Sequence, residues 1–424
     1  MEKIIQYIWQ KRKLSPHPLH TTDGKKVEVI NPGLYNHDAG PDFLEAHIKI
    51  DGVLWVGNVE IHEKTSDWFR HHHNNDPRYK NIILHVVLQN DTSRPLFSSS
   101  PSLNPPTLVI EIPEYVLDNY DALLQSHTNP RCKDVVLSFQ KMAIHNWMSS
   151  LLVERLEQKT KHIKELCVRF DNNWEDVLFI IFARYFGLGI NSNAFEEWAK
   201  SFPIHIIKKF SNNLFQLEAF FLGQAGLLDN PPNIVISDLT KDKLEKLQRE
   251  YKYLSTLYTT HPINVTMWKY MRTRPQNFPH TRLLQLAQFY HTRRFSISAV
   301  LEPFYSGVIS KHYYYTLLDL PITVNTKNVI IINCIIPIIF AYGKYRGNIL
   351  FCEKSLDLLE SIPKENNRIT RQWVDAGIWC ENAADSQALI QLVKNYCYRR
   401  DCLHCRFGNE YIKRHPDFLC EEEI

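Results

Sequence analysis

The sequence has almost no net charge, which removes one of the simplest clues to a partner. Its 424 residues carry 49 Lys and Arg against 46 Asp and Glu, a formal net charge of +3 at pH 7. A domain that binds nucleic acid through its overall field is usually much more basic. Any affinity for nucleic acid must therefore come from a local patch. With 44% hydrophobic residues the composition is otherwise that of a folded protein of two or three domains.

The sequence also lacks the marks of an exported or membrane protein. Its N-terminus, MEKIIQYIWQKRKL, has an acid at position 2 and no small-residue cleavage site, so it indicates an amphipathic helix instead of a signal peptide. The most apolar run, Asn328–Gly343, is shorter than the roughly 20 residues of a membrane helix, and it contains Asn333 and Pro337. We expect a cytoplasmic protein that makes no membrane contact and buries this run in its core.

The hydrophobic pattern of the first ninety residues predicts the order α-β-β-β-α-β. The expected elements are a helix at 2–13, strands at 26–31, 46–51 and 53–62, a short helix at 67–75, and a strand at 82–88. Asp51-Gly52 is a strong signal for a hairpin between the second and third strands. The last strand, IILHVVL, is continuously apolar, as in strands buried on both faces.

The rest of the chain is expected to be mostly helical. The Ser- and Pro-rich stretch 92–107 predicts a surface loop, and beyond about residue 138 the apolar residues follow a helical period. We therefore expect an α/β domain at residues 1–125, and a helical domain at 126–424 that includes a cysteine cluster near the C-terminus.

Two carboxylates on neighbouring strands form the first candidate site. Strand side chains alternate, so Asn58, Glu60 and His62 share one face, although a solvated surface strand shows the same alternation. Asp42, in the stretch GPDF, precedes the strand before the hairpin, which places it near Glu60. Such a pair of carboxylates can bind Mg²⁺ or Mn²⁺, and a neighbouring basic group can activate water.

The order of these elements resembles the core of the PD-(D/E)XK nucleases, in which Pro-Asp precedes one strand and Glu-x-Lys ends the next. The resemblance implies a restriction-endonuclease-like fold, with Asp42 and Glu60 as metal ligands. His62 stands where these nucleases have Lys. His62 could then be the base or a metal ligand, Lys64 could reach back to the site, or the site could be inactive.

Longer stretches of the sequence resemble a bacterial family of unknown function, DUF2851. They are NPGLYNHDAGPDF from Asn31, GNVEIHEKTSDWFRHHH from Gly57, FLGQAGLL from Phe221, RTRPQNFP from Arg272 and YCYRRDCLHC from Tyr396. The resemblance that these stretches carry extends over most of the chain. The family carries no assigned activity, so the nuclease expectation depends on the shorter core pattern.

Further histidines lie near the first candidate site. One interpretation of the run at 71–73 and of His85 is a transition-metal site built from imidazoles. The interpretation that we favour is that the run is a solvated face of a short polar helix. His85, inside an apolar strand, is then a hydrogen-bonded core residue.

Cysteines near the C-terminus form the second candidate site. Cys397, Cys402 and Cys405 lie in a segment too polar for a core, and a chain without an export signal favours thiols or metal ligands over disulfides. Thiolates at this spacing bind Zn²⁺ or an iron–sulfur cluster with a fourth ligand. The candidates for the fourth ligand are Cys132, Cys380, Cys420 and His404. We expect Cys132, because it lies in a polar loop; the alternative is three reduced thiols without a metal.

Some PD-(D/E)XK nucleases are similar in holding a 4Fe–4S cluster with one distant cysteine and three clustered ones. In those nucleases the distant cysteine precedes the core, whereas here Cys132 follows it. The resemblance in the cysteine pattern is therefore incomplete.

A third, weaker candidate is a basic loop in the helical region. Arg272, Arg274 and Arg282 are interleaved with aromatic residues, a composition suited to phosphate contacts and base stacking. The arginines could equally cap helices and pair with acids.

Together these patterns favour a metal-dependent nuclease that hydrolyses DNA or RNA. The alternative is a catalytically inactive protein of the same fold that binds nucleic acid or protein. Hydrolysis of another phosphate ester remains a third hypothesis.

Overall fold

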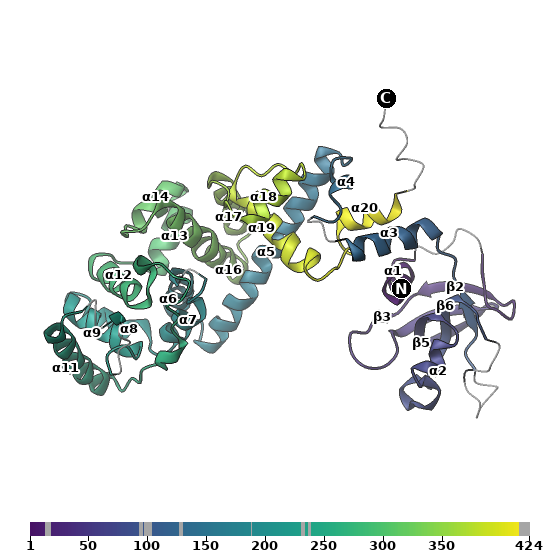
Figure 1. Cartoon of the computed structure of the whole chain (residues 1–424), viewed down its shortest axis with the longest axis horizontal. Helices are drawn as coiled ribbons and strands as arrows, with labels where there is room; N and C mark the ends of the chain where they lie inside the picture. Colours follow the sequence, from purple (N-terminus) through teal and green to yellow (C-terminus); the bar gives the residue numbers. More distant parts are fainter. Residues whose placement is uncertain are drawn as a thin grey trace. The chain divides into compact units, whose positions relative to one another are not determined.

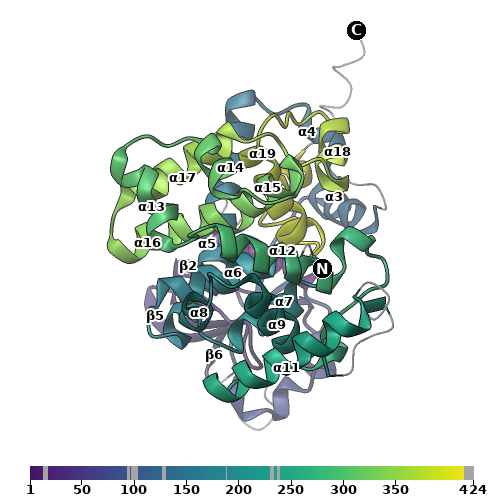
Figure 2. The same cartoon turned by 90° about the vertical axis from the view of Figure 1, so that its left-hand side faces the viewer.

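The computed structural model describes residues 1–12, 18–92, 96, 104–126, 130–187, 189–229, 234–235 and 239–414 (Figures 1 and 2). By contacts the chain divides into two compact units. The first contains Met1–Phe139 and Lys394–Ile424, and the second contains Gln140–Val393. The domains expected from the sequence were 1–125 and 126–424, so the division by contacts differs in giving the C-terminal segment to the first unit.

In the residues that the structure describes, the first unit holds a mixed sheet of seven strands. They are β1 Leu19–His20, β2 Lys26–Asn31, β3 Leu34–Tyr35, β4 Phe43–Ile50, β5 Val53–Lys64, β6 Ile82–Gln89 and β7 Thr107–Val109. The order across the sheet is β1-β2-β4-β5-β6-β7, and β3 pairs with β4 beside this path. Strands β1, β2, β4 and β5 are antiparallel to their neighbours, whereas β5, β6 and β7 run parallel. The α/β character expected of this region is confirmed.

The hairpin between β4 and β5 shapes the first candidate site. Asp51 and Gly52 both have positive φ, 47° and 83°, which suits a two-residue hairpin and confirms the Asp-Gly signal. Strand β4 begins at Phe43, earlier than expected, and Glu45 has a φ of 56° where the register to β5 shifts. This bulge bends the chain just after Asp42, and bulges of this kind re-aim side chains beside functional sites.

Two sets of helical turns flank the sheet. Helix α1, Glu2–Gln10, contacts β5 and buries Ile4, Ile5 and Trp9. The short helix expected at 67–75 is divided into α2 Asp67–Arg70, η1 His73–Asn75 and η2 Pro77–Tyr79. The division occurs because His72 takes a left-handed conformation with φ 60°. The chain therefore turns within the histidine run and does not continue as a helix.

Three further helices belong to the first unit. They are α3 Glu114–Gln125, α4 Lys133–Val136 and α20 Arg406–Lys413. Helix α20 contacts both α3 and α4, although α20 lies far from both of them in the sequence (Figure 1). The C-terminal segment is thus packed on the chain that follows the sheet.

The second unit is helical, as expected. Its main helices are α5 Lys141–Arg169, α6 Trp174–Phe186, α7 Ser192–Lys200, α8 Ile204–Lys209, α9 Leu214–Gln224, α11 Lys241–Tyr258, α12 Pro279–Thr292, α13 Ile297–Ser306, α14 Lys311–Leu317, α15 Val324–Ile330, α16 Ile336–Arg346, α17 Ile349–Ser361, α18 Arg368–Asp375 and α19 Ala383–Gln391. Figure 2 shows α9 beside α11, and the two are in contact. Aromatic side chains fill much of this core, among them Phe182, Phe220 and Trp198, none of which is exposed.

The apolar run expected in the core is part of a longer helix. Val324–Arg346 is long and apolar enough to cross a membrane by length and composition, and 67% of its most apolar window is buried within the structure. A wider π-turn at Ile331–Ile335 precedes Pro337, where the missing N–H of proline breaks the regular ladder. Burial on this scale is typical of the core helix of a globular unit.

Candidate functional site

Asp42 and Glu60 come together where β4 and β5 leave their regular pairing. The backbone N–H of Asp42 donates to Glu60 Oε2 at 3.0 Å, and the backbone N–H of Ile61 donates to Asp42 Oδ2 at 3.0 Å. Each carboxylate is thus held by the backbone of the other strand. Asp42 and Ile61 lie just beyond the last pair of β4 with β5, Phe43 with Val59, so their backbone N–H groups can hold the two acids.

In the described residues, the carboxylates of Asp42 and Glu60 have no permanent cation as a partner. Burial, with the neighbouring Glu60, raises the pKa of Asp42 to about 7, and burial raises the pKa of Glu60 to about 8. Within the part of the chain that the structure describes, neither acid forms an ion pair with Lys or Arg. Two buried carboxylates without a fixed cation repel each other when both are charged. Among the described residues, the pair thus has no lysine or arginine to balance its charge.

Three imidazoles cluster together, and two of them contact Glu60. His62 lies on β5, His71 follows α2 and His73 begins η1, and one ring nitrogen of each lies within 4.8 Å of the other two. His71 Nδ1 is 3.2 Å from His62 Nε2. Glu60 Oε1 is 3.6 Å from His62 Nε2 and 3.3 Å from His73 Nε2.

These spacings match those of ligands around a single metal ion. A tetrahedral ion with bonds of about 2.0–2.1 Å to nitrogen or oxygen holds its ligand atoms about 3.3 Å apart. Three imidazoles and a carboxylate suit Zn²⁺, Mn²⁺ or Fe²⁺, whereas Mg²⁺ prefers oxygen ligands throughout. The residues present therefore fit a transition metal better than the magnesium considered from the sequence.

His85 orients His62 within this group. His62 Nδ1 is 2.8 Å from His85 Nε2, and the His85 side chain is completely buried on β6. Burial, assisted by the neighbouring imidazoles, lowers the pKa of His62 to about 2, and burial lowers the pKa of His85 to about 3. Both rings are therefore neutral at pH 7, the form in which imidazole binds a metal. A hydrogen bond between His62 Nδ1 and His85 leaves His62 Nε2 directed at the site.

Aromatic rings form the wall behind the histidines. The rings of His73 and Tyr79 stack with centroids 3.9 Å apart, and Trp68 meets His73 edge to face at 5.5 Å. Trp68 itself is fully buried. These contacts hold His73 on the side of Glu60, although His73 lies on a short irregular turn.

A cleft with cationic side chains opens beside Asp42 in the first unit. Its volume is about 550 Å³, and Gln6, one of the residues that line it, donates to Asp42 Oδ1 at 2.8 Å. Lys3, Arg399 and Arg400 line the same cleft and are exposed. The carboxylate site is therefore one side chain away from a surface suited to phosphate groups.

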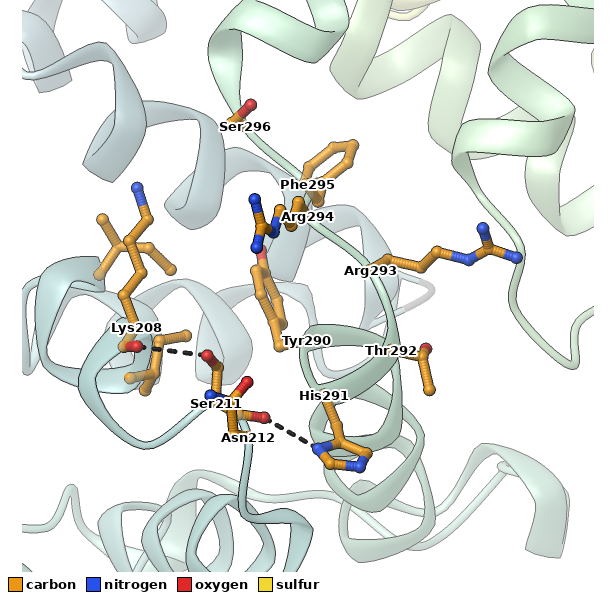
Figure 3. Close-up of a pocket in the computed structure, with 12 residues that line it drawn as sticks. Lys208, Ser211, Asn212, Tyr290, His291, Thr292, Arg293, Arg294, Phe295 and Ser296 are labelled. Atoms are coloured by element: carbon orange, nitrogen blue, oxygen red, sulfur yellow. Dashed lines mark hydrogen bonds between the residues drawn. The ribbon is translucent and has the colours of Figure 1, made fainter.

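The second unit contains a pocket of a different kind. Its volume is about 560 Å³, and Figure 3 shows Lys208, Arg294 and the ring of Tyr290 among the residues that line it. Arg293 forms an ion pair with Asp319 and points away from Lys208 (Figure 3). The lining contains no Asp or Glu, so this pocket offers no carboxylate ligand to a divalent cation.

The other residues expected at functional sites are placed less favourably. The side chain of Lys64 is exposed, and its charge acts on Asp91 instead of on the two site carboxylates. Arg272 and Arg274 are exposed, but Arg282 is 5% exposed and lies over the ring of Phe186 at 5.1 Å. Of the three arginines, only Arg272 and Arg274 can meet a ligand at the surface.

Sequence reasoning set aside the histidines that complete the site. The sequence favours a solvated face for His71 and His73. In the structure both lie beside His62, because the chain turns at His72. The interpretation of His85 as a buried, hydrogen-bonded residue agrees with its position, although its partner is another imidazole. The available signal was the alternate spacing of His71 and His73 shortly after a strand that contains Glu-Ile-His.

Comparison with known proteins gives a family and no activity. The sequence model of a family described as a protein of unknown function, DUF2851, matches residues 2–319 and 312–368. No curated protein and no solved structure matches the chain. Any function must therefore be argued from the site itself.

Proposed function

Because the chain belongs to the DUF2851 family, whose description assigns no activity, we propose from the site itself that the first unit is a metal-dependent nuclease. The observation that carries this proposal is the cluster of His62, His71 and His73 at the spacing of metal ligands, beside the paired carboxylates of Asp42 and Glu60. We further propose that the sheet is a PD-(D/E)XK-like core. In support, Asp42 precedes β4, Glu60 lies on the antiparallel neighbour β5, and β6 follows in parallel.

The residues divide into ligands and positioning groups. Glu60, His62, His71 and His73 would hold the ion, which when bound polarises a phosphate ester and lowers the pKa of water. Asp42 keeps Glu60 in place through its backbone N–H and presents its own carboxylate beside it. His62 is neutral at pH 7, so it cannot replace the positive charge of the lysine in related cores. It acts instead as a metal ligand, because neutral imidazole is the form that binds metal.

The substrate class follows from the cleft beside the carboxylates. Lys3, Arg399 and Arg400 give it three cations, and Gln6 connects it to Asp42. A polyanion lying along these cations would bring a phosphate close to the carboxylates. A chain of phosphodiesters, DNA or RNA, fits this arrangement better than a small ester does, because several cations line the cleft.

The second candidate function is a binding protein of the same fold without catalysis. The observation that favours it is the exposed position of Lys64, which leaves the site without a lysine. Such a protein would still bind nucleic acid in the cationic cleft. The two functions therefore differ in cleavage and not in binding.

Cleavage of single- and double-stranded DNA and RNA by the metal-depleted full chain tests the proposal. We expect cleavage on addition of Mn²⁺, and weaker cleavage with Mg²⁺ because of the imidazole ligands. Glu60→Gln and His73→Asn should each reduce the rate by about a hundredfold or more, since both remove a ligand. Glu63→Gln is the matched control, because Glu63 lies on β5 but points to the other face.

The outcomes separate the two functions. Cleavage that needs no metal, or that survives Glu60→Gln unchanged, would contradict the nuclease proposal. Binding of nucleic acid without cleavage under any metal would favour the binding protein.

A further inference from the structure

Four cysteines lie in the two separate chain segments that make up the first unit. Cys132 immediately precedes α4, and Cys405 immediately precedes α20. Cys397 and Cys402 lie in the segment that leads into α20. The first unit is interrupted in sequence by the whole second unit. Any group bound by all four thiols would therefore tie its two segments together.

Packing brings the two cysteine-bearing segments into contact. Helix α20 contacts α4, and the ring of Phe407 meets that of Phe139 edge to face at 5.1 Å. Arg414 Nη1 donates to the carbonyl of Asp134 at 3.4 Å. At Gly408 a Cβ atom would lie 2.5 Å from the carbonyl oxygen of Cys402. The loop with Cys402 thus folds tightly against the start of α20.

The contact of α20 with α4 brings the segments that carry the four cysteines to one place in the first unit. Burial raises the pKa of the Cys132 thiol, and the sulfurs of Cys405, Cys397 and Cys402 raise it further. Burial likewise raises the pKa of Cys397 and Cys405 to about 12. Cys132 and Cys405 are buried and Cys397 and Cys402 are partly buried, and neutral thiols are weak donors that satisfy few polar neighbours. A metal centre would convert them to thiolates.

The side chain of Arg131 independently indicates a negatively charged group near the four cysteines. Its Nη1 atom is buried without a hydrogen-bond partner. Its charge acts on Cys397 and Cys402, whose thiol pKa values it lowers against the larger effect of burial. A buried N–H group without a partner is costly unless an acceptor faces it. Thiolates around a metal centre would supply that acceptor.

The spacing of the sulfurs distinguishes between metal centres. A zinc ion with bonds of about 2.3 Å to sulfur holds four thiolates about 3.8 Å apart. Among the described residues, however, the only group of three or more metal-ligating side chains with donor atoms within 4.8 Å is that of the histidines. The four sulfurs are therefore more widely spaced than around zinc. An iron–sulfur cluster distributes its thiolates over two or more irons and so accepts a wider spacing.

We propose that Cys132, Cys397, Cys402 and Cys405 bind an iron–sulfur cluster that fixes the C-terminal segment to the first unit. Arg399 and Arg400, which line the cationic cleft, lie between Cys397 and Cys402. The cluster would thus hold the two arginines in place along the cleft. The cluster itself does not depend on the nuclease proposal, because nothing in the thiol site requires cleavage.

Metal analysis of the full chain, purified without oxygen and supplied with ferrous iron and sulfide, tests this inference. We expect about two or four irons per chain with matching sulfide, and a broad visible absorption that bleaches on reduction. Cys132→Ser and Cys402→Ser should lose most of the iron. Cys380→Ser is the matched control, because Cys380 is a buried cysteine of the second unit, and it should retain the iron of the parent.

Several results would overturn the inference. The first is a stoichiometric amount of zinc without iron, and the second is a chain that contains no iron after reconstitution. The third is an iron content of Cys132→Ser equal to that of the parent. Because a serine variant could fail to fold, the parent is also treated with a thiol-alkylating reagent. The four cysteines should be protected while iron is bound and become reactive after chelation, and equal alkylation in the two states would contradict the proposal.

Discussion

Two buried glutamates, one in each unit, are held in opposite ways. Glu60 is 5% exposed and Glu196 is 4% exposed. Glu196, on α7, is 2.5 Å from Lys200 Nζ and 3.2 Å from His162 Nε2, and it also pairs with Arg184. Glu60, by contrast, contacts the imidazoles of His62 and His73, whose pKa values burial lowers.

The electrostatic consequences are opposite as well. Burial favours the protonated form of Glu196, but hydrogen bonds from His162 and Lys200, with the charge of Arg184, outweigh it and hold its pKa well below the usual range. Burial raises the pKa of Glu60 to about 8. Folding therefore completes the surroundings of Glu196 but leaves the charge of Glu60 uncompensated. The first arrangement is structural, and the second is typical of a site that takes its cation from solution.

The largest expected effect is the loss of stability on replacing Glu196. Glu196→Gln leaves two permanent cations and His162 around a neutral amide, so we expect the free energy of unfolding to fall by about 3 kcal/mol. Chemical denaturation followed by circular dichroism measures this change. The matched control is Glu197→Gln, because Glu197 is largely exposed and pairs only with Lys200 among the described residues. A surface pair of that kind contributes at most about 1 kcal/mol.

Equal effects of the two substitutions would break the comparison. The ion pairs of Glu196 would then stabilise the fold no more than an exposed ion pair does, and its low pKa would not indicate a structural role.

The next effect is stabilisation of the first unit by a divalent metal. At a Mn²⁺ concentration a hundredfold above the dissociation constant, the parent should gain about 2.7 kcal/mol, because the ion binds only the folded site. Glu60→Gln should lose most of this gain, whereas Glu196→Gln should keep it. Thermal unfolding with and without Mn²⁺ is the measurement. A metal response that is the same in Glu60→Gln would place the ion elsewhere.

The sequence predicted the features of the site that depend on neighbouring residues only. The alternation of Asn58, Glu60 and His62 and the Asp-Gly turn are properties of neighbouring residues. They were enough to expect Asp42 beside Glu60, as the structure has it. The fold class of both regions followed in the same way from hydrophobic periods.

The rest of the site depends on conformations that no pattern indicates. His73 reaches Glu60 because His72 adopts a left-handed conformation, and the sequence favours such a turn only weakly at histidine. Arg282 belongs to the buried face of α12 together with Leu283 and Leu286. The basic and aromatic composition of the surrounding segment had suggested an exposed patch. In both cases tertiary packing decided what the local sequence left open.

The smallest expected effect is a difference in the sign of the pH dependence of stability, measured without metal. The folded state raises the pKa of Glu60 from its ordinary 4.5 to about 8, so it retains a proton that the unfolded chain has already released. This contribution is fully present below pH 4.5 and is lost as the pH rises toward 8, with a slope of at most about 1.4 kcal/mol per pH unit.

Glu196 should act in the reverse direction. Its folded pKa is lowered from 4.5, so its contribution is present above that pH and is lost as the pH falls through the folded value. Between about pH 5 and 8, Glu60→Gln should therefore flatten the decline in stability with rising pH, while Glu196→Gln should leave it unchanged. Below about pH 4 only Glu196→Gln should flatten the profile. Denaturant titrations across this range measure both slopes, and profiles with the same sign for the two glutamates would contradict their assignment to a metal site and a structural ion-pair cluster.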